Sequence, residues 1–136
     1  MTQHGYQVAI LKGTTDGDGA AVVDSDIALT GELIYADVDG AALTDSANLV
    51  VQTILYELSS GAVELGETIV NHADIGNAAQ DKIYPRKFAH DNAGADLVVA
   101  TGQKVATPYF IPGAKLRATV SAGGDTKAFR IRLFVR

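Results

Sequence analysis

Short runs in which apolar and polar residues alternate make up most of the chain, and glycine, aspartate and serine separate them. Alternation with a period of two is typical of a β-strand with one buried face. Residues 31–38 (GELIYADV) divide in this way into two faces: Leu33, Tyr35 and Asp37, and Ile34, Ala36 and Val38. Further β-like runs lie at 6–12, 49–56, 63–70, 82–90 and 103–111.

The clearest alternation lies at the end of the chain. Before the sequence AGGD, apolar residues alternate with polar ones, and the same happens after it. The apolar positions are Leu116, Ala118 and Val120, then Phe129, Ile131, Leu133 and Val135. The later ones alternate with Arg130, Arg132, Phe134 and Arg136. The pattern predicts a hairpin with one apolar face and one cationic face.

About eight short strands with regularly spaced turns predict an all-β fold. We expect an antiparallel β-sandwich, jelly-roll-like, formed by residues 1–136 as a single domain. The 136 residues are 47% hydrophobic and 20% charged, which is typical of a globular protein. No apolar run approaches the roughly 18 residues of a membrane-spanning helix, so no membrane association is expected.

The charges are divided unevenly along the chain. Residues 1–81 carry thirteen acids and one base, a net charge of −12, and residues 82–136 carry ten bases and three acids, a net charge of +7. Acidic and basic strands that pair side by side would explain this division. A molecule with two oppositely charged poles, suited to docking on neighbours, would explain it equally well. Nucleic-acid binding is disfavoured because the chain is acidic overall.

The candidate metal ligands form no strong motif. Asp16, Asp18 and Asp24 loosely suggest a calcium loop, but Gly19 and the alanines that follow it supply no further side-chain ligands, which favours a solvated turn. His72 and Asp74 lie two positions apart, which is more typical of a surface loop than of a metal site. There is no cysteine, so thiol ligands are excluded. We therefore expect no metal and no cofactor.

Enzymatic motifs are equally weak. Asp37 and Asp39 share one face of a predicted strand, as the two carboxylates of a glycosidase do, but the chain has no tryptophan on which a sugar ring could stack. Neither the H-E-x-x-H motif nor the G-x-S-x-G motif occurs. We predict a protein that is not an enzyme and has no catalytic residues.

The segment 83–94 (IYPRKFAHDNAG) is the strongest candidate for a binding surface. Pro85 has no backbone N–H, which assigns it to a sheet edge, to a strand start or to a position beside a bulge. In an extended chain Tyr84, Arg86, Phe88 and His90 share one face and would form an interface. The alternative is that both aromatic rings belong to the core and that Arg86 pairs with an acid from the first half of the chain.

Three segments resemble small virion proteins of tailed bacteriophages: GELIYADVD, IYPRKFAHDNAG and KLRATVSAGGDTKAFRIRLFVR. The resemblance covers about two thirds of the chain. It implies a β-sandwich decoration or cement protein, a homotrimer bound to the major capsid protein on the outer surface of the phage head. The basic sequence Arg130-Ile131-Arg132 departs from the pattern of this group. The departure affects the docking partner that the resemblance implies, but not the implied fold.

Our first hypothesis is therefore that the chain is a capsid decoration or cement protein that stabilises the shell. Arg130 and Arg132 would contact an acidic surface, and Tyr84, Arg86, Phe88 and His90 would contribute the other part of the interface. The alternative is a tail- or fibre-associated module that recognises a host glycan. A small hydrolase is a third hypothesis without a supporting motif.

Overall fold

A computed structural model describes residues 7–57, 59–60, 62–76 and 81–136. Thirteen strands and no helix lie within these residues, so none of them belongs to a helix of membrane-spanning length. The strands are β1 (Gln7–Thr14), β2 (Ala21–Asp24), β3 (Leu29–Asp39), β4 (Asn48–Glu57), β5 (Val63–His72), β6 (Asp81–Ile83), β7 (Arg86–Phe88), β8 (Val98–Ala100), β9 (Gln103–Lys104), β10 (Ala106–Pro108), β11 (Phe110–Ala114), β12 (Leu116–Ser121) and β13 (Ala128–Val135). Tyr6, which begins the first predicted strand, lies outside the described residues.

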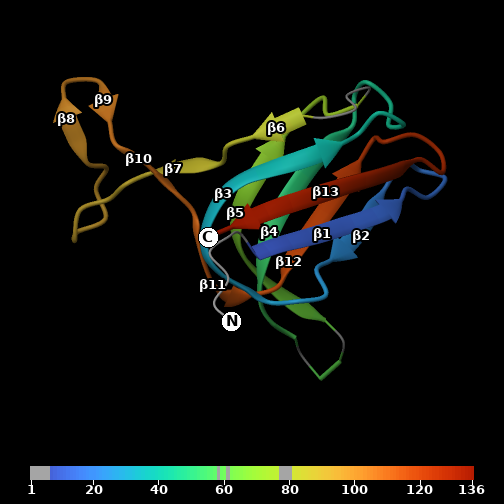
Figure 1. The fold of residues 1–136 in the computed structure, drawn as a ribbon, viewed down its shortest axis with the longest axis horizontal. Helices are drawn as coiled ribbons and strands as arrows, with labels where there is room; N and C mark the ends of the chain where they lie inside the picture. Colours follow the sequence, from blue (N-terminus) through green and yellow to red (C-terminus); the bar gives the residue numbers. More distant parts are fainter. Residues whose placement is uncertain (1–6, 58, 61, 77–80) are drawn as a thin grey trace.

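Two antiparallel sheets form the body of the molecule (Figure 1). The first sheet has the order β1-β13-β3-β11, with β6 also paired to β3, and the second has the order β2-β12-β4-β5. Early strands pair with late ones throughout: β1 with β13, β2 with β12 and β3 with β11. One long antiparallel ribbon thus wraps across both sheets, which is the jelly-roll arrangement. The predicted fold class, an antiparallel jelly-roll sandwich with eight principal strands, is confirmed.

The inward faces of the two sheets meet in one apolar core. Alternate residues of each strand supply it, as expected for strands with one buried face. From the first sheet come Leu11, Leu33, Val38, Ile131 and Leu133, and from the second come Leu49, Val51, Leu116, Ala118 and Val120, all of them fully buried. Each large apolar side chain buried in this way contributes about 1.5–3 kcal/mol to stability.

The predicted terminal hairpin is wrong, although both of its strands exist. β12 pairs with β2 and β4 in the second sheet, whereas β13 pairs with β1 and β3 in the first. The two apolar faces meet across the core instead of forming one continuous face. The turn between them is a corner that crosses from one sheet to the other, and the N–H of Gly123 donates to the carbonyl of Gly19 in the neighbouring corner (2.9 Å).

The predicted faces of β3 also need one correction. Tyr35 is paired with Phe134, and Leu33 is paired with Val135, so Ile34 is an extra residue in a β-bulge. The bulge turns Leu33 into the core beside Ala36 and Val38, away from the face of Tyr35 and Asp37. The alternation of apolar and polar residues cannot reveal this bulge, because the sequence GELIYADV is compatible both with a regular strand and with a strand that has an extra residue at Ile34.

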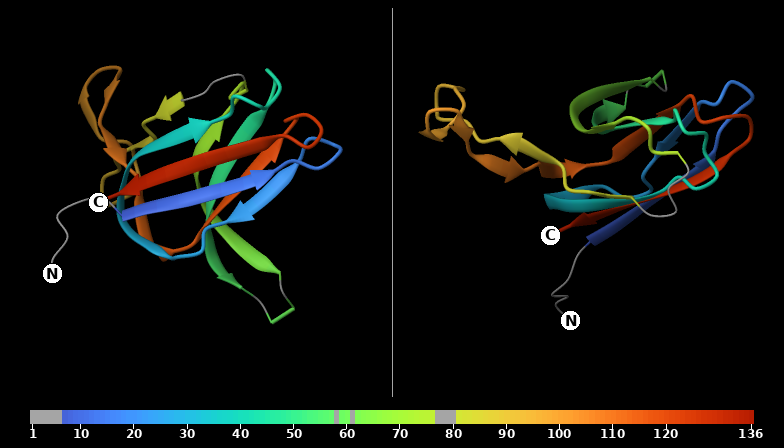
Figure 2. Two further views of the ribbon diagram at one scale, coloured as in Figure 1. Left: turned by 45° about the vertical axis from the view of Figure 1, so that its right-hand side comes forward. Right: turned by 90° about the horizontal axis from the view of Figure 1, so that it is seen from above.

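A long connection between β5 and β11 leaves the sandwich and returns to it. Its first strand, β6, pairs with β3. Pro85 separates β6 from β7, which pairs with β10. The single strand predicted at 82–90 is therefore wrong, because this segment contains two strands with different partners. β8 pairs with β9 at the tip. Residues 86–108 form an arm that projects from the body (Figures 1 and 2). The side chain of Lys87 lies 3.4 Å from Glu67 of β5 at its base.

A candidate docking surface

The outer face of the first sheet carries an aromatic cluster. The rings of Tyr35 and Phe134, which are paired across β3 and β13, stack with centroids 4.3 Å apart. Tyr84 follows β6 and places its ring 5.8 Å from that of Tyr35. Its side chain is 59% exposed, and Val8 and Ile10 on the outer side of β1 are also exposed. We call the outer face of β1, β13, β3 and β6 the docking face.

Next to the aromatic cluster lies an ion pair. Arg132 bonds to Asp37, which is 5% exposed, and the guanidinium lies 5.9 Å from the ring of Phe134. Asp37 Oδ1 and Arg132 Nε are both buried with no hydrogen-bond partner among the described residues. Lys82 lies opposite Asp37 on the other side of β3. Arg132 therefore first neutralises a buried acid of its own chain, and its predicted contact with an acidic partner stays a prediction.

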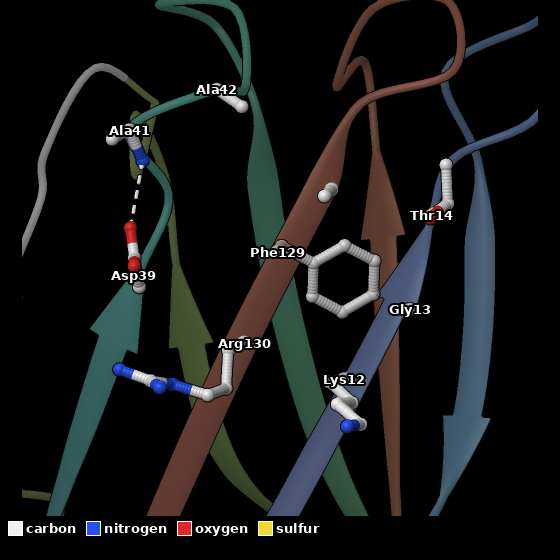
Figure 3. A pocket seen from close by; sticks show the side chains of 9 residues that line it. Lys12, Gly13, Thr14, Asp39, Ala41, Ala42, Phe129 and Arg130 are labelled. Atoms are coloured by element: carbon white, nitrogen blue, oxygen red, sulfur yellow. Dashed lines mark hydrogen bonds between the residues drawn. The ribbon is translucent and has the colours of Figure 1, made fainter.

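The third part of the docking face is cationic. Arg130 is paired in register with Lys12 of β1 on one side and with Asp39 of β3 on the other. Figure 3 shows Arg130 extending from β13 toward β3, while Asp39 points to the N–H of Ala41 (3.3 Å). These side chains border an open pocket of about 640 Å³. In contrast to Arg132, Arg130 is exposed and has no hydrogen-bond or ion-pair partner among the described residues.

The four residues predicted from the segment 83–94 lie along the docking face and the arm. Tyr84 belongs to the aromatic cluster, and Arg86 at the junction donates to the carbonyls of Ile34 (3.1 Å) and Pro85 (2.7 Å). Phe88 is 51% exposed, and Lys104 lies 4.7 Å from its ring centroid. The alternative of two core rings and an Arg86 bound to an acid is thus wrong for the described residues. Whether these side chains form an interface stays a prediction.

A small polar cluster lies near the tip of the arm. His90 Nε2 lies 3.0 Å from Asp96 Oδ1, and Lys104 Nζ lies 2.7 Å from Asp96 Oδ2. The hydrogen bond from Lys104 is the main cause of a lowered pKa for Asp96, and the charges of Lys104 and His90 act in the same direction. His90 is therefore attached to an acid of the arm itself.

Paired charges account for part of the uneven charge distribution. Arg117 binds Asp24 through two bonds, 2.7 and 2.9 Å long, and Arg132 and Lys87 pair with Asp37 and Glu67. Each of these three pairs joins the acidic part of the chain to the basic part. The interpretation of paired acidic and basic strands therefore holds at these three positions.

The docking face also has members that were not predicted from the sequence as site residues. Tyr35, Phe134 and Lys12 were not singled out, because aromatic residues in an alternating strand usually belong to the core. The signal was present for Phe134, which alternates with the buried residues of β13 on the same side as Arg130 and Arg132. For Lys12 there was none, since its position beside Arg130 depends on the pairing of the first and last strands.

The acidic loop at Asp16 is a turn. Asp16 Oδ1 accepts hydrogen bonds from the N–H groups of Asp18 (2.9 Å) and Ala20 (3.0 Å), so the carboxylate is used by the backbone. Within the ranges that the structure describes, no three histidine, aspartate or glutamate side chains are grouped so as to hold a metal ion.

Comparison with known proteins adds little to this description. No protein family and no curated protein matches the sequence. Among solved structures, the Yersinia pseudotuberculosis-derived mitogen is similar with a TM-score of 0.47 and 12% identity, over 96% of this chain and 87% of that one. A structure of infectious bursal disease virus, Gx strain, has a TM-score of 0.28 and 10% identity, and the 97% of this chain that it covers spans only 33% of the viral chain. These similarities assign no function to the chain.

Proposed function

We propose that this chain is a decoration or cement protein on the outer surface of a tailed-phage head, with the major capsid protein as its partner. The observation that carries the proposal is the docking face, where exposed aromatic and aliphatic side chains lie beside arginine and lysine and lead into the arm. Aromatic residues and arginine are enriched at the centres of protein interfaces. The resemblance of three sequence segments to phage virion proteins agrees with this assignment.

The jelly-roll fold is compatible with this role but does not select it. Jelly rolls occur in viral capsids and in lectins, and a fold alone does not determine function. A glycan site needs an aromatic ring that is free to stack on a sugar. On the docking face the rings of Tyr35 and Phe134 stack on each other, so Tyr84 is the ring of the cluster that is largely exposed.

A shell protein of this kind works through many weak contacts. Each bound copy that prefers the intact shell to the broken one stabilises it by mass action. A patch of exposed side chains such as Tyr84, Val8 and Ile10 suits an interface in which each copy contributes a few kcal/mol. The unpaired cation Arg130 would add attraction to an acidic shell surface, and this attraction would weaken as salt is raised.

Binding to capsids from which the decoration protein has been removed tests the proposal. We expect the purified chain to sediment with such shells at low salt and to raise their rupture temperature. Tyr84→Ala and Arg130→Glu should each weaken binding at least tenfold. Val22→Ala, at an exposed apolar position of the second sheet, and Lys115→Glu, at an exposed cation outside the docking face, are the matched controls. Failure of the unaltered chain to bind would refute the proposal.

The contribution of the arm can be tested separately. Arg86 and Pro108 are paired in register, so a short Gly-Ser linker can replace residues 87–107 without separating the strands at the base. We expect the shortened chain to keep its circular dichroism and its unfolding transition but to bind shells at least tenfold more weakly. Unchanged binding by a folded variant would remove the arm from the interface.

The predicted homotrimer and head location need their own measurements. Light scattering should give three times the chain mass of 14.2 kDa, and gold-labelled antibody should mark the head of intact particles. A monomer in solution that also binds shells as a monomer would contradict the trimer. Label on the tail, together with binding to a glycan array and none to shells, would favour the fibre-associated alternative.

A further inference from the structure

Two cations face each other on the docking face without an acid between them. Lys12 and Arg130 are directly opposite in the pairing of β1 with β13, and both side chains are exposed. Neither has a hydrogen-bond or ion-pair partner among the described residues. Like charges in this position destabilise a pair of strands. The arrangement therefore costs free energy unless something negative lies between the two side chains.

The space for such a group is present. The open pocket of about 640 Å³ is bordered by the two cations, by the hydroxyl-bearing Thr14 and by small residues that leave room: Gly13, Ala41, Ala42 and Ala128. This volume lies within the range of small-ligand sites. In Figure 3 the guanidinium of Arg130 turns away from Lys12 and toward β3. This orientation keeps the two like charges apart and brings Arg130 toward the strand of Asp39.

We propose that this pocket binds an acidic group, a carboxylate or a phosphate, between Lys12 and Arg130. The third charged residue, Asp39, lies on the far side of Arg130, and its Oδ1 accepts the N–H of Ala41. The pocket thus offers two positive charges against one negative charge. A surface arginine changes rotamer within nanoseconds, so Arg130 can turn back toward Lys12 when an anion arrives. The proposal does not depend on the shell as partner.

Bound anion should alter stability in a characteristic way. In the unaltered chain, an anion between the two cations removes their repulsion and binds only the folded state, so it raises the melting temperature. Lys12→Gln removes the repulsion without any anion. This variant should therefore melt above the unaltered chain in anion-free buffer and should gain nothing from added phosphate.

The decisive experiment is a titration followed by NMR on the full chain. Inorganic phosphate and glutarate are added separately at constant ionic strength, with chloride as the balancing salt, and the amide signals of Gly13 and Ala128 are recorded. Saturable shifts are expected with one or both anions, and the stronger of the two identifies the acidic group. Lys12→Gln and Arg130→Gln should weaken binding at least tenfold, whereas Lys115→Gln should not.

Three results would overturn the proposal. One is a change in the amide chemical shifts of Gly13 and Ala128 that grows linearly with the concentration of either anion and does not saturate, because this indicates charge screening without a binding site. Another is equal affinity in Lys12→Gln, Arg130→Gln and Lys115→Gln. The last, which needs no ligand, is a melting temperature of Lys12→Gln that falls below that of Lys115→Gln in anion-free buffer. Shell binding plays no part in these readouts, so their failure leaves the proposed function to its own tests.

Discussion

The segments 16–20 and 91–95 share the sequence Asp-x-x-Gly-Ala and form the same turn. In each, the aspartate Oδ1 accepts the N–H groups two and four positions later, at 2.8–3.0 Å. In each, the glycine has a left-handed φ, +80° for Gly19 and +86° for Gly94. The side-chain bonds and the glycine conformation are local features of the turn. The pattern alone does not specify it, because the same pattern at 37–41 has its aspartate paired with Arg132 and a glycine without left-handed φ.

The two turns differ in what surrounds them, which gives a test. A Cβ on Gly94 would meet no atom within 4 Å, so Gly94→Ala should cost only the left-handed backbone, about 1–2 kcal/mol. A Cβ on Gly19 would lie 2.8 Å from the backbone nitrogen of Gly124, so Gly19→Ala adds a clash with the opposite corner. Urea unfolding should show the larger loss for Gly19→Ala. Equal losses would mean that the two corners do not pack as described.

The buried ion pair can be compared with an exposed one. Arg132→Ala leaves the carboxylate of Asp37 buried without its partner and should cost about 3–5 kcal/mol. Arg117→Ala breaks the pair with Asp24, whose side chain is 37% exposed and can be hydrated, and should cost about 1 kcal/mol from the ion pair. Chemical denaturation measures both. If Arg132→Asp costs no more than Arg132→Ala, then Asp37 is not buried as a charged group.

At the scale of elements, the arm tip should respond to acid. The pKa of Asp96 is lowered, chiefly by the hydrogen bond from Lys104, so the bond stabilises the folded tip at pH values above the ordinary 3.8. This contribution is lost as the pH falls below 3.8 through the lowered value. Carboxyl NMR should show Asp96 titrating below 3.8, with faster exchange of the Leu97 amide after protonation. In Lys104→Gln the titration should move back toward 3.8, and an unchanged value would contradict the assignment.

The strands were predictable from the sequence to the extent that their cause is local. Alternation in 116–120 and 129–135 identifies β12, β13 and their buried faces, since side chains of a strand alternate by necessity. Alternation does not determine whether two apolar faces lie side by side in one sheet or face each other across the core. In this protein the faces of β12 and β13 face each other across the core. The position of Lys12 beside Arg130 depends on that pairing, which is why only half of the cationic pair was found in advance.

At the scale of the whole molecule, the first and last strands hold the sandwich together. Gln7 is paired with Val135, and the ribbon continues through both sheets, so the fold depends on contacts between the two ends of the chain. Such long-range pairing requires closure of a large loop before any contact stabilises it. Folding in milliseconds to seconds is expected for this kind of topology.

A circular permutant tests this dependence. Val135 can be joined through Arg136 and residues 1–6 to Gln7, and the chain can be opened in the turn 91–95 near the tip of the arm. The pairing of β1 with β13 then becomes local, while both sheets keep their strands. Stopped-flow refolding should be at least several-fold faster than in the original chain, and the free energy of unfolding should change by about 1 kcal/mol or less apart from the lost turn. A permutant that folds no faster would show that closure of the terminal ribbon does not limit folding, and one that fails to fold would show that the intact arm is needed by the sandwich.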